Sequence, residues 1–212
     1  MNDLPADDVL TMLMPEFMAL YEKRPIERNL GGLECESSLV VWWVLKSIPE
    51  LTHVIECGVF LGQTSWLIEN TRPDVATCHS DPALPVLFNH LCHRTRGRYT
   101  VLDFLDFSYF PKASGTTLAF FDDHQDVLPR LEMCIERGIR HVLLDDNWKG
   151  LGDHMTWWLY QNTPLIPDIA KRMECVSKQI AEQIEFRHVQ NLGGLLAAQA
   201  QHQNMTYLRL KE

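Results

Sequence analysis

Apolar residues follow two kinds of spacing along this 212-residue chain. Some segments carry an apolar side chain every three or four residues, which predicts amphipathic helices, and short continuous apolar runs between them predict buried strands. The helical spacing covers residues 5–23, 34–47, 64–70, 84–94, 127–137 and 166–183. The predicted strands cover residues 53–55, 75–79, 99–105, 116–121, 139–144, 184–190 and 205–210.

The order of these elements predicts a fold class. Strands that alternate with helices indicate a doubly wound α/β sheet, with parallel strands and helices on both faces. The last two strands lack a long obvious crossover, so we expect an antiparallel pair at one edge of a seven-stranded sheet. A chain of this length is expected to fold as one domain, residues 1–212.

Composition and charge narrow the classes of partner. The formal net charge of −9 argues against a general nucleic-acid binder, which needs clustered lysine and arginine. No apolar run is long enough to span a bilayer, and the N-terminus lacks a basic region followed by an apolar one. The six cysteines form no Cys-x-x-Cys pair, so we interpret them as reduced core residues and expect a cytoplasmic protein.

One strand-to-helix junction combines an acid with two glycines. Glu56 ends a strand, Gly58 and Gly62 follow, and Thr64 and Ser65 open a helix. Gly58 permits a sharp turn, Gly62 permits close approach of a ligand, and the exposed amides of the helix start favour a carboxylate or another polar group. The acid disfavours a pyrophosphate, and no Gly-x-Gly-x-x-Gly is present, so a nicotinamide-binding protein is a weaker interpretation.

The pattern Glu-x-Gly-x-x-x-Gly-x-x-Ser resembles the first motif of class I S-adenosylmethionine-dependent methyltransferases. The resemblance implies a Rossmann-like fold and a loop around the methionine half of S-adenosylmethionine. It also implies that Asp81, before Pro82, binds the ribose, although the catechol branch has its acid three residues before the proline, where this chain has His79. Asp103 would read the adenine amino group, and Phe104 either packs on the base or belongs to the core.

Two acidic stretches, each at the end of a predicted strand, resemble metal-dependent O-methyltransferases of the catechol type. They read Phe-Phe-Asp-Asp-His-Gln over residues 120–125 and Val-Leu-Leu-Asp-Asp-Asn over residues 142–147. The resemblance implies Mg²⁺ ligands at Asp123, Asp146 and Asn147. Oxygen ligands suit a hard cation, and only Lys149 and Lys112 are expected nearby to balance the acids.

The chain departs from the catechol enzymes at the base. Their lysine is missing here, where Gln125 and Asp126 follow the histidine, so the base is predicted to be His124 or a spare carboxylate, Asp122 or Asp145. Asp123 and His124 are the predicted catalytic residues. The Asp-Asp-Asn segment and the Gly-x-Gly-Asp that follows also resemble macrocin-type sugar O-methyltransferases. Candidate residues for a sugar acceptor are Asp145, Trp148, Asp153 and His154.

The sequence therefore predicts a cation-dependent O-methyltransferase that acts on a sugar or glycan hydroxyl. Residues 1–48 would cover the cofactor pocket, and residues 49–212 would form the Rossmann-like core. Three alternatives remain: a metal-independent enzyme, a catechol-like small-molecule enzyme, and an inactive cofactor-binding partner module. The oligomeric state is not indicated.

Overall fold

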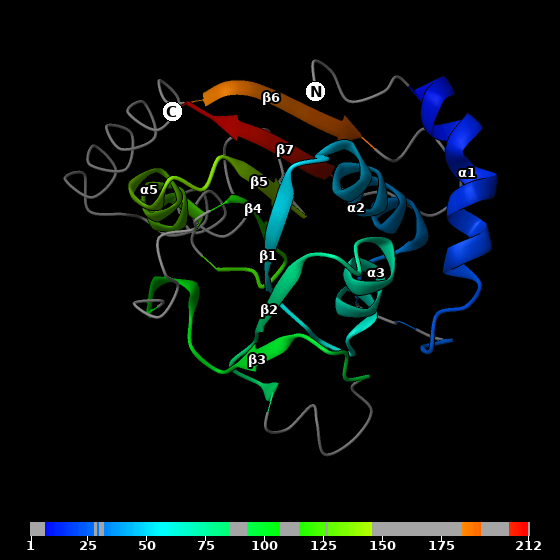
Figure 1. Ribbon diagram of the computed structural model, residues 1–212, viewed down its shortest axis with the longest axis horizontal. Coiled ribbons are helices and arrows are strands. Elements are labelled where there is room, and N and C mark those ends of the chain that lie inside the picture. Colours follow the sequence, from blue (N-terminus) through cyan, green and yellow to red (C-terminus); the bar gives the residue numbers. More distant parts are fainter. Residues whose placement is uncertain are drawn as a thin grey trace, which may run out of the picture.

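Seven strands form one sheet in the computed structural model, which describes residues 7–27, 29, 32–84, 93–106, 115–125, 127–145, 184–191 and 204–211. The strand order is β3-β2-β1-β4-β5-β7-β6 (Figure 1). The strands are β1 (Leu51–Cys57), β2 (Ala76–Ser80), β3 (Arg98–Thr100), β4 (Thr116–Phe121), β5 (His141–Leu144), β6 (Ile184–Asn191) and β7 (Asn204–Leu210).

Strands β1 to β5 pair in parallel, and β7 is antiparallel to both of its neighbours, β5 and β6. This confirms the expected antiparallel pair at one edge. The order reverses direction between β1 and β4, so the carboxyl ends of these two strands flank the crevice in which doubly wound sheets bind ligands.

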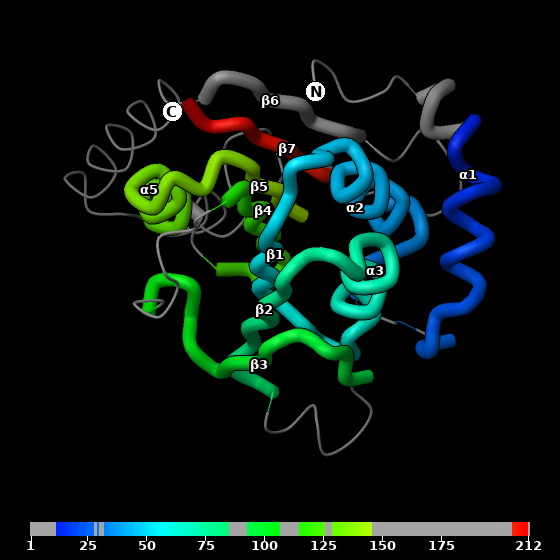
Figure 2. Tube along the Cα trace, viewed as in Figure 1, coloured from blue at the N-terminus to red at the C-terminus, as the bar shows by residue number. Residues whose placement is uncertain are grey.

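Helices cover both faces of the sheet, as predicted. Helices α1 (Asp7–Tyr21), α2 (Cys35–Ser47) and α3 (Gln63–Thr71) lie on one face, and α5 (Val127–Arg137) lies on the other (Figures 1 and 2). One apolar cluster packs α1, α2 and α3 against alternate residues of the strands, such as Val54 and Phe120. A second cluster under α5 takes the intervening residues, such as Ile55 and Phe121.

The third strand is shorter than the sequence indicates. It ends at Thr100, and a 3₁₀ turn (Phe104–Asp106) replaces the rest of the apolar run 99–105. Local side chains end the strand, since the amide of Leu102 donates to Thr100 Oγ1 and the amide of Leu105 donates to Asp103 Oδ1. Hydrogen bonds of this kind compete with a strand ladder.

Two predicted helices, 84–94 and 166–183, lie wholly or mostly outside the described residues. Among the helices of the described part, none is long and apolar enough to cross a membrane.

Candidate functional site

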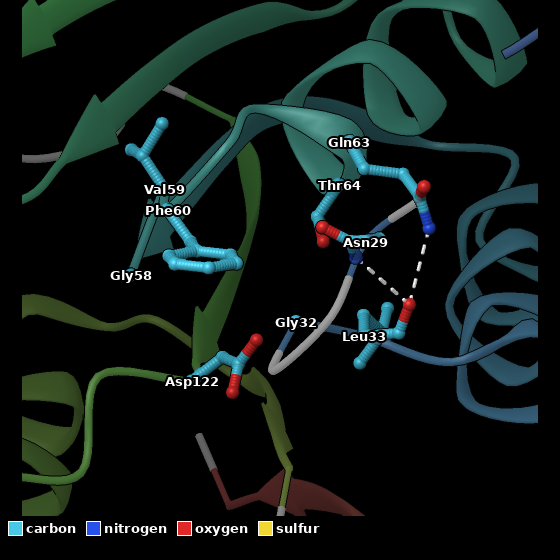
Figure 3. Close-up of a pocket in the computed structure, with 9 residues that line it drawn as sticks. All are labelled: Asn29, Gly32, Leu33, Gly58, Val59, Phe60, Gln63, Thr64 and Asp122. Carbon is cyan, nitrogen blue, oxygen red and sulfur yellow. Dashed lines mark hydrogen bonds between the residues drawn. The ribbon is translucent and has the colours of Figure 1, made fainter. Parts of the chain in front are cut away.

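A small pocket lies at the carboxyl ends of β1 and β4, beside the first turn of α3. It is lined by Asn29, Gly32, Leu33, Gly58, Val59, Phe60, Gln63, Thr64 and Asp122 (Figure 3). The connection between α1 and α2 supplies the first three of these residues, and Asp122 approaches from the end of β4. The free volume of the cavity is about 10 Å³, which is room for about one water molecule.

The turn that forms the floor of this pocket requires glycine at its first position. Gly58 has φ +98°, and a Cβ there would stand 2.4 Å from the carbonyl oxygen of Asp122. Gly62 caps α3 with φ +84°, and Phe60 between them is also left-handed, with φ +46°. Asp81 stabilises the turn, because its Oδ2 accepts the amides of Val59 and Phe60 at 3.0 and 3.1 Å.

Glu56 and Ser65, both predicted to contact the cofactor, are joined in a buried network beneath the pocket. Glu56 Oε2 accepts hydrogen bonds from Ser65 Oγ and from His79 Nδ1, both at 2.5 Å. The other ring nitrogen of His79 lies 3.4 Å from Glu69 Oε1, and Tyr99 packs on the imidazole with 4.8 Å between ring centroids. Glu56, Ser65 and His79 are fully buried. We call Glu56, His79 and Glu69 the closed network.

Hydrogen bonds within the closed network shift the pKa values of His79 and Glu69. Burial alone would lower the pKa of His79, but the bonds to Glu56 and Glu69 outweigh it and raise the pKa to about 9. For the acid Glu69 burial acts in the opposite direction and raises the pKa. Hydrogen bonds from His79, Thr95 and the amides of Arg96 and Gly97 outweigh burial and leave the pKa of Glu69 well below its usual value. The raised pKa favours the protonated form of His79 at neutral pH.

A second network joins the ends of β3 and β4 on the opposite face of the sheet. Arg130 of α5 donates from Nη1 to Asp123 Oδ1 at 2.6 Å and from Nη2 to Asp103 Oδ2. Its side chain is 1% exposed and lies over the ring of Phe121. We call Asp103, Arg130 and Asp123 the open network, because its two acids are 37% and 13% exposed.

The expectation that only lysines lie near these acids was wrong, because Arg130, in the first turn of α5, forms ion pairs with Asp123 and Asp103. Burial raises the pKa of Asp123, and the neighbouring Arg130 offsets part of that rise. The pKa of Arg130 is raised despite its burial, chiefly by Asp123. The planar guanidinium of Arg130 therefore fixes the orientation of both acids.

Other predicted site residues have distinct environments. Phe104 is buried and packs edge-on against Phe121, which places it in the core. His124 is exposed and has φ +55°, and Asp145 is buried at the end of β5. Within the described ranges, no three histidines, cysteines or acids lie close enough to hold a metal ion. The remaining candidates lie outside the described residues: Asp146, Asn147, Trp148, Asp153 and His154.

Sequence reasoning missed Gln63 and Leu33 as pocket residues. Gln63 Nε2 donates to the Leu33 carbonyl and to the Tyr21 hydroxyl, so it fastens the N-terminal segment over the pocket. Its place directly after Gly62, at the first position of a helix, was the signal available in the sequence. For Leu33 the sequence offered no signal.

No family model matches the chain, and no curated protein matches it. Similar solved structures include the O-methyltransferase from Bacillus cereus in complex with SAH, which is 11% identical with a TM-score of 0.54 over 97% of this chain and 92% of that chain. The SAH-bound Podospora anserina methyltransferase PaMTH1 is 8% identical, with a TM-score of 0.53 and full coverage of both chains. Cofactor-bound Rv0187 from MTB is 10% identical, with a TM-score of 0.52 and full coverage of both.

These likenesses agree with the strand order and establish the fold. The chain has the Rossmann-like fold of class I S-adenosylmethionine-dependent methyltransferases, as its sequence predicts.

Proposed function

We propose that this chain is an S-adenosylmethionine-dependent O-methyltransferase. The observation that carries the proposal is the pocket at the topological switch point, where the Gly58 turn and the first turn of α3 meet. Ligands of doubly wound sheets bind at this position. Two of the similar structures are described as holding S-adenosylhomocysteine, the product of methyl transfer from this cofactor.

The residues of the pocket fit the methionine half of such a cofactor. Gln63 Oε1, in the pocket wall, and Glu56 Oε1, beneath it, are both buried without a hydrogen-bond partner. An unpaired buried acceptor is costly, and an ammonium group would supply the missing donors. Asp122 adds a carboxylate to the same pocket, which also favours a cation.

Ligand entry requires the pocket to open. Its free volume is far smaller than any cofactor, and both Asn29 Nδ2 and Gln63 Nε2 donate to the Leu33 carbonyl at 3.1 Å. We expect these two hydrogen bonds to break as Leu33 moves outward on binding. The N-terminal residues 1–48 would then act as the cover of the cofactor site.

Proton removal would fall to the end of β4. When bound, the cofactor would supply an electrophilic methyl group on sulfur. The acceptor oxygen forms a bond to that carbon as the carbon–sulfur bond breaks, and its proton passes to Asp123 or His124. Arg130 holds Asp123 by one oxygen and so sets the direction of the carboxylate. Alignment of this kind accounts for a large part of many enzymatic rate enhancements.

The proposed acceptor is a hydroxyl of a sugar or glycan. A divalent cation, with Mg²⁺ as the first candidate, is proposed to assist the reaction. The resemblance of the Asp-Asp-Asn and Gly-x-Gly-Asp segments to sugar O-methyltransferases supports this acceptor. Asp123, Asp146 and Asn147 would hold the cation, which would polarise the acceptor oxygen.

A metal-independent methyltransferase is the second candidate, and the Arg130–Asp123 pair favours it. A guanidinium already neutralises the carboxylate that the cation would need. Asp123 can bind both Arg130 and a metal ion only if the metal ion takes the carboxylate oxygen that Arg130 does not contact. Otherwise Arg130 has to move away.

Labelled methyl transfer from S-adenosylmethionine tests both candidates. The acceptor panel contains sugars, deoxyhexoses, glycans and a catechol, each with Mg²⁺ and with a chelator. Transfer to sugars that stops in the chelator supports the cation, and equal transfer in both supports the second candidate. Asp123→Ala should abolish most turnover and spare cofactor binding, whereas Asp106→Ala, which removes an exposed acid nearby, should not. Cofactor binding without transfer to any acceptor would identify an inactive partner module.

A further inference from the structure

The closed network connects the two walls of the cofactor pocket. One wall of the pocket is the turn after β1, which contains Gly58, and Glu56 lies two residues before that glycine. The other wall is the start of α3, which contains Thr64, and Ser65 is the next residue. The 2.5 Å hydrogen bond between them therefore fixes the distance between the walls. His79 reaches both: it binds Glu56 directly and contacts Glu69, one turn further along the same helix.

A third element is attached through Glu69. Its carboxylate accepts the amides of Arg96 and Gly97 and the Thr77 hydroxyl. Gly97 has no room for a side chain, because a Cβ there would stand 2.2 Å from His79 Nε2. The imidazole is thus enclosed on all sides by backbone, ring and carboxylate groups.

The geometry indicates an imidazolium. Both ring nitrogens of His79 face carboxylate oxygens, and an imidazole donates from both nitrogens only when it is protonated. The titratable or charged groups that face it are Glu56 from β1, Glu69 from α3 and Tyr99 from β3, with Arg96 on the far side of Glu69. Thr95 Oγ1, at 3.5 Å from Nε2, could instead donate to a neutral ring, so the protonation state is the point to measure.

We propose that His79 is a positioning residue for cofactor binding: as an imidazolium it clamps Glu56, and through Glu56 and Ser65 the first turn of α3, against the Gly58 turn. This inference rests on the proposed function. It gives His79 a role that differs from that of the ribose-binding acid which the catechol resemblance implies at the same position. The raised pKa of His79 agrees with it. Loss of the proton would remove one donor and loosen both pocket walls.

Calorimetry of S-adenosylhomocysteine binding to the full chain, from pH 6.5 to 10, tests the proposal. The wild-type dissociation constant should rise about tenfold more than that of His79→Gln over this range, because the variant lacks the titrating clamp. The amino group of the ligand titrates in the same range but contributes equally to both proteins. Glu69→Gln should move the wild-type midpoint to lower pH.

His141→Gln is the matched control. His141 is also a buried strand histidine, but burial lowers its pKa to about 4, so it stays neutral across this range. Its variant should follow the wild-type pH profile. Identical profiles for the wild type and His79→Gln would overturn the proposal.

Nitrogen-15 NMR of the imidazoles keeps the proposal testable if His79→Gln does not fold. At pH 8 His79 should show two protonated nitrogens and His141 one, and a neutral His79 would overturn the clamp. Wild-type protein that binds no S-adenosylhomocysteine at any pH would overturn the proposed function as well. Binding without the pH difference would overturn only the role of His79.

Discussion

The protein contains two networks of the same chemical type on opposite faces of one sheet. The closed network places His79 between Glu56 and Glu69, and the open network places Arg130 between Asp103 and Asp123. Each places one basic side chain between two acidic ones, and each ties strand ends to the helix packed on its face.

The networks differ in their access to solvent. Every side chain of the closed network is 7% exposed or less, whereas Asp123 is 13% and Asp103 37% exposed in the open one. Electrostatic attraction between charged groups is stronger in a low dielectric. A buried network in which every group is paired therefore holds its members rigidly. A carboxylate that exchanges a proton with an acceptor must be reachable. The difference in exposure therefore supports the two proposed roles, positioning for the closed network and proton transfer for the open one.

Removing the cation of the open network should have the largest effect on stability. Arg130→Met leaves Asp123, which is only 13% exposed, beside Asp103 without its cation, and removal of one member of a buried ion pair costs about 3–5 kcal/mol. Urea denaturation measures the free energy of unfolding. Arg137→Met, in the last turn of the same helix and half-buried, should cost much less. Equal losses for the two variants would show that the fork contributes nothing beyond helix packing.

The closed network should lose its stabilising effect as the pH rises. The pKa of His79 rises on folding from 6.5 to about 9, so its contribution is fully present below pH 6.5 and is lost as the pH passes through 9. The loss should be on the order of 3 kcal/mol in the free energy of unfolding. Urea denaturation of the wild type and His79→Gln from pH 6 to 10 measures it. A constant difference between the two proteins across that range would contradict the prediction.

Gly58 lies between the two networks, and its replacement should disturb both. In Gly58→Ala the new Cβ would be strained by the φ of +98° and would also clash with the Asp122 carbonyl. In Gly138→Ala the φ of +71° gives a similar strain, but no atom lies within 4 Å of the new Cβ. The strain alone costs about 1–2 kcal/mol, so thermal denaturation should show that loss in Gly138→Ala and a greater one in Gly58→Ala. Cofactor affinity should fall only in Gly58→Ala. Equal stability of the two variants would mean that the turn relaxes freely.

The outermost acid should matter least. Asp103 is more than a third exposed, and ion pairs with exposed members are worth roughly 0–1 kcal/mol, so Asp103→Asn should destabilise by no more than that. Asp123→Asn, at 13% exposure, should destabilise more in the same urea titration. The reverse order would mean that exposure does not distinguish the two acids of the open network.

Periodicity alone determined most of the fold. Strand β4 and helix α5 occupy the predicted ranges, and β1, β2, β5, β6 and β7 lie within a few residues of theirs. The antiparallel edge pair was predicted correctly as well. These features depend on local apolar spacing and on the handedness and length of connections, and both are written along the chain. The third strand was overestimated, because the Thr100 and Asp103 side chains turn the chain where its apolar residues continue.

Only the tertiary structure decided which polar residues meet. The sequence placed Glu56, Asp81, Asp103 and Asp123 at neighbouring strand ends, and they do lie at the same end of the sheet. It could not show that Glu56 turns towards His79 while Asp123 turns towards Arg130. Successive strand residues point to opposite faces, so Glu56 and Asp123 meet different helices and different neighbours from the other strands. Helix α3 follows β1 directly and α5 follows β4 directly, but His79 comes from β2 and Asp103 from beyond the end of β3. Strand pairing and helix packing together, not local spacing, therefore bring the members of each network into contact.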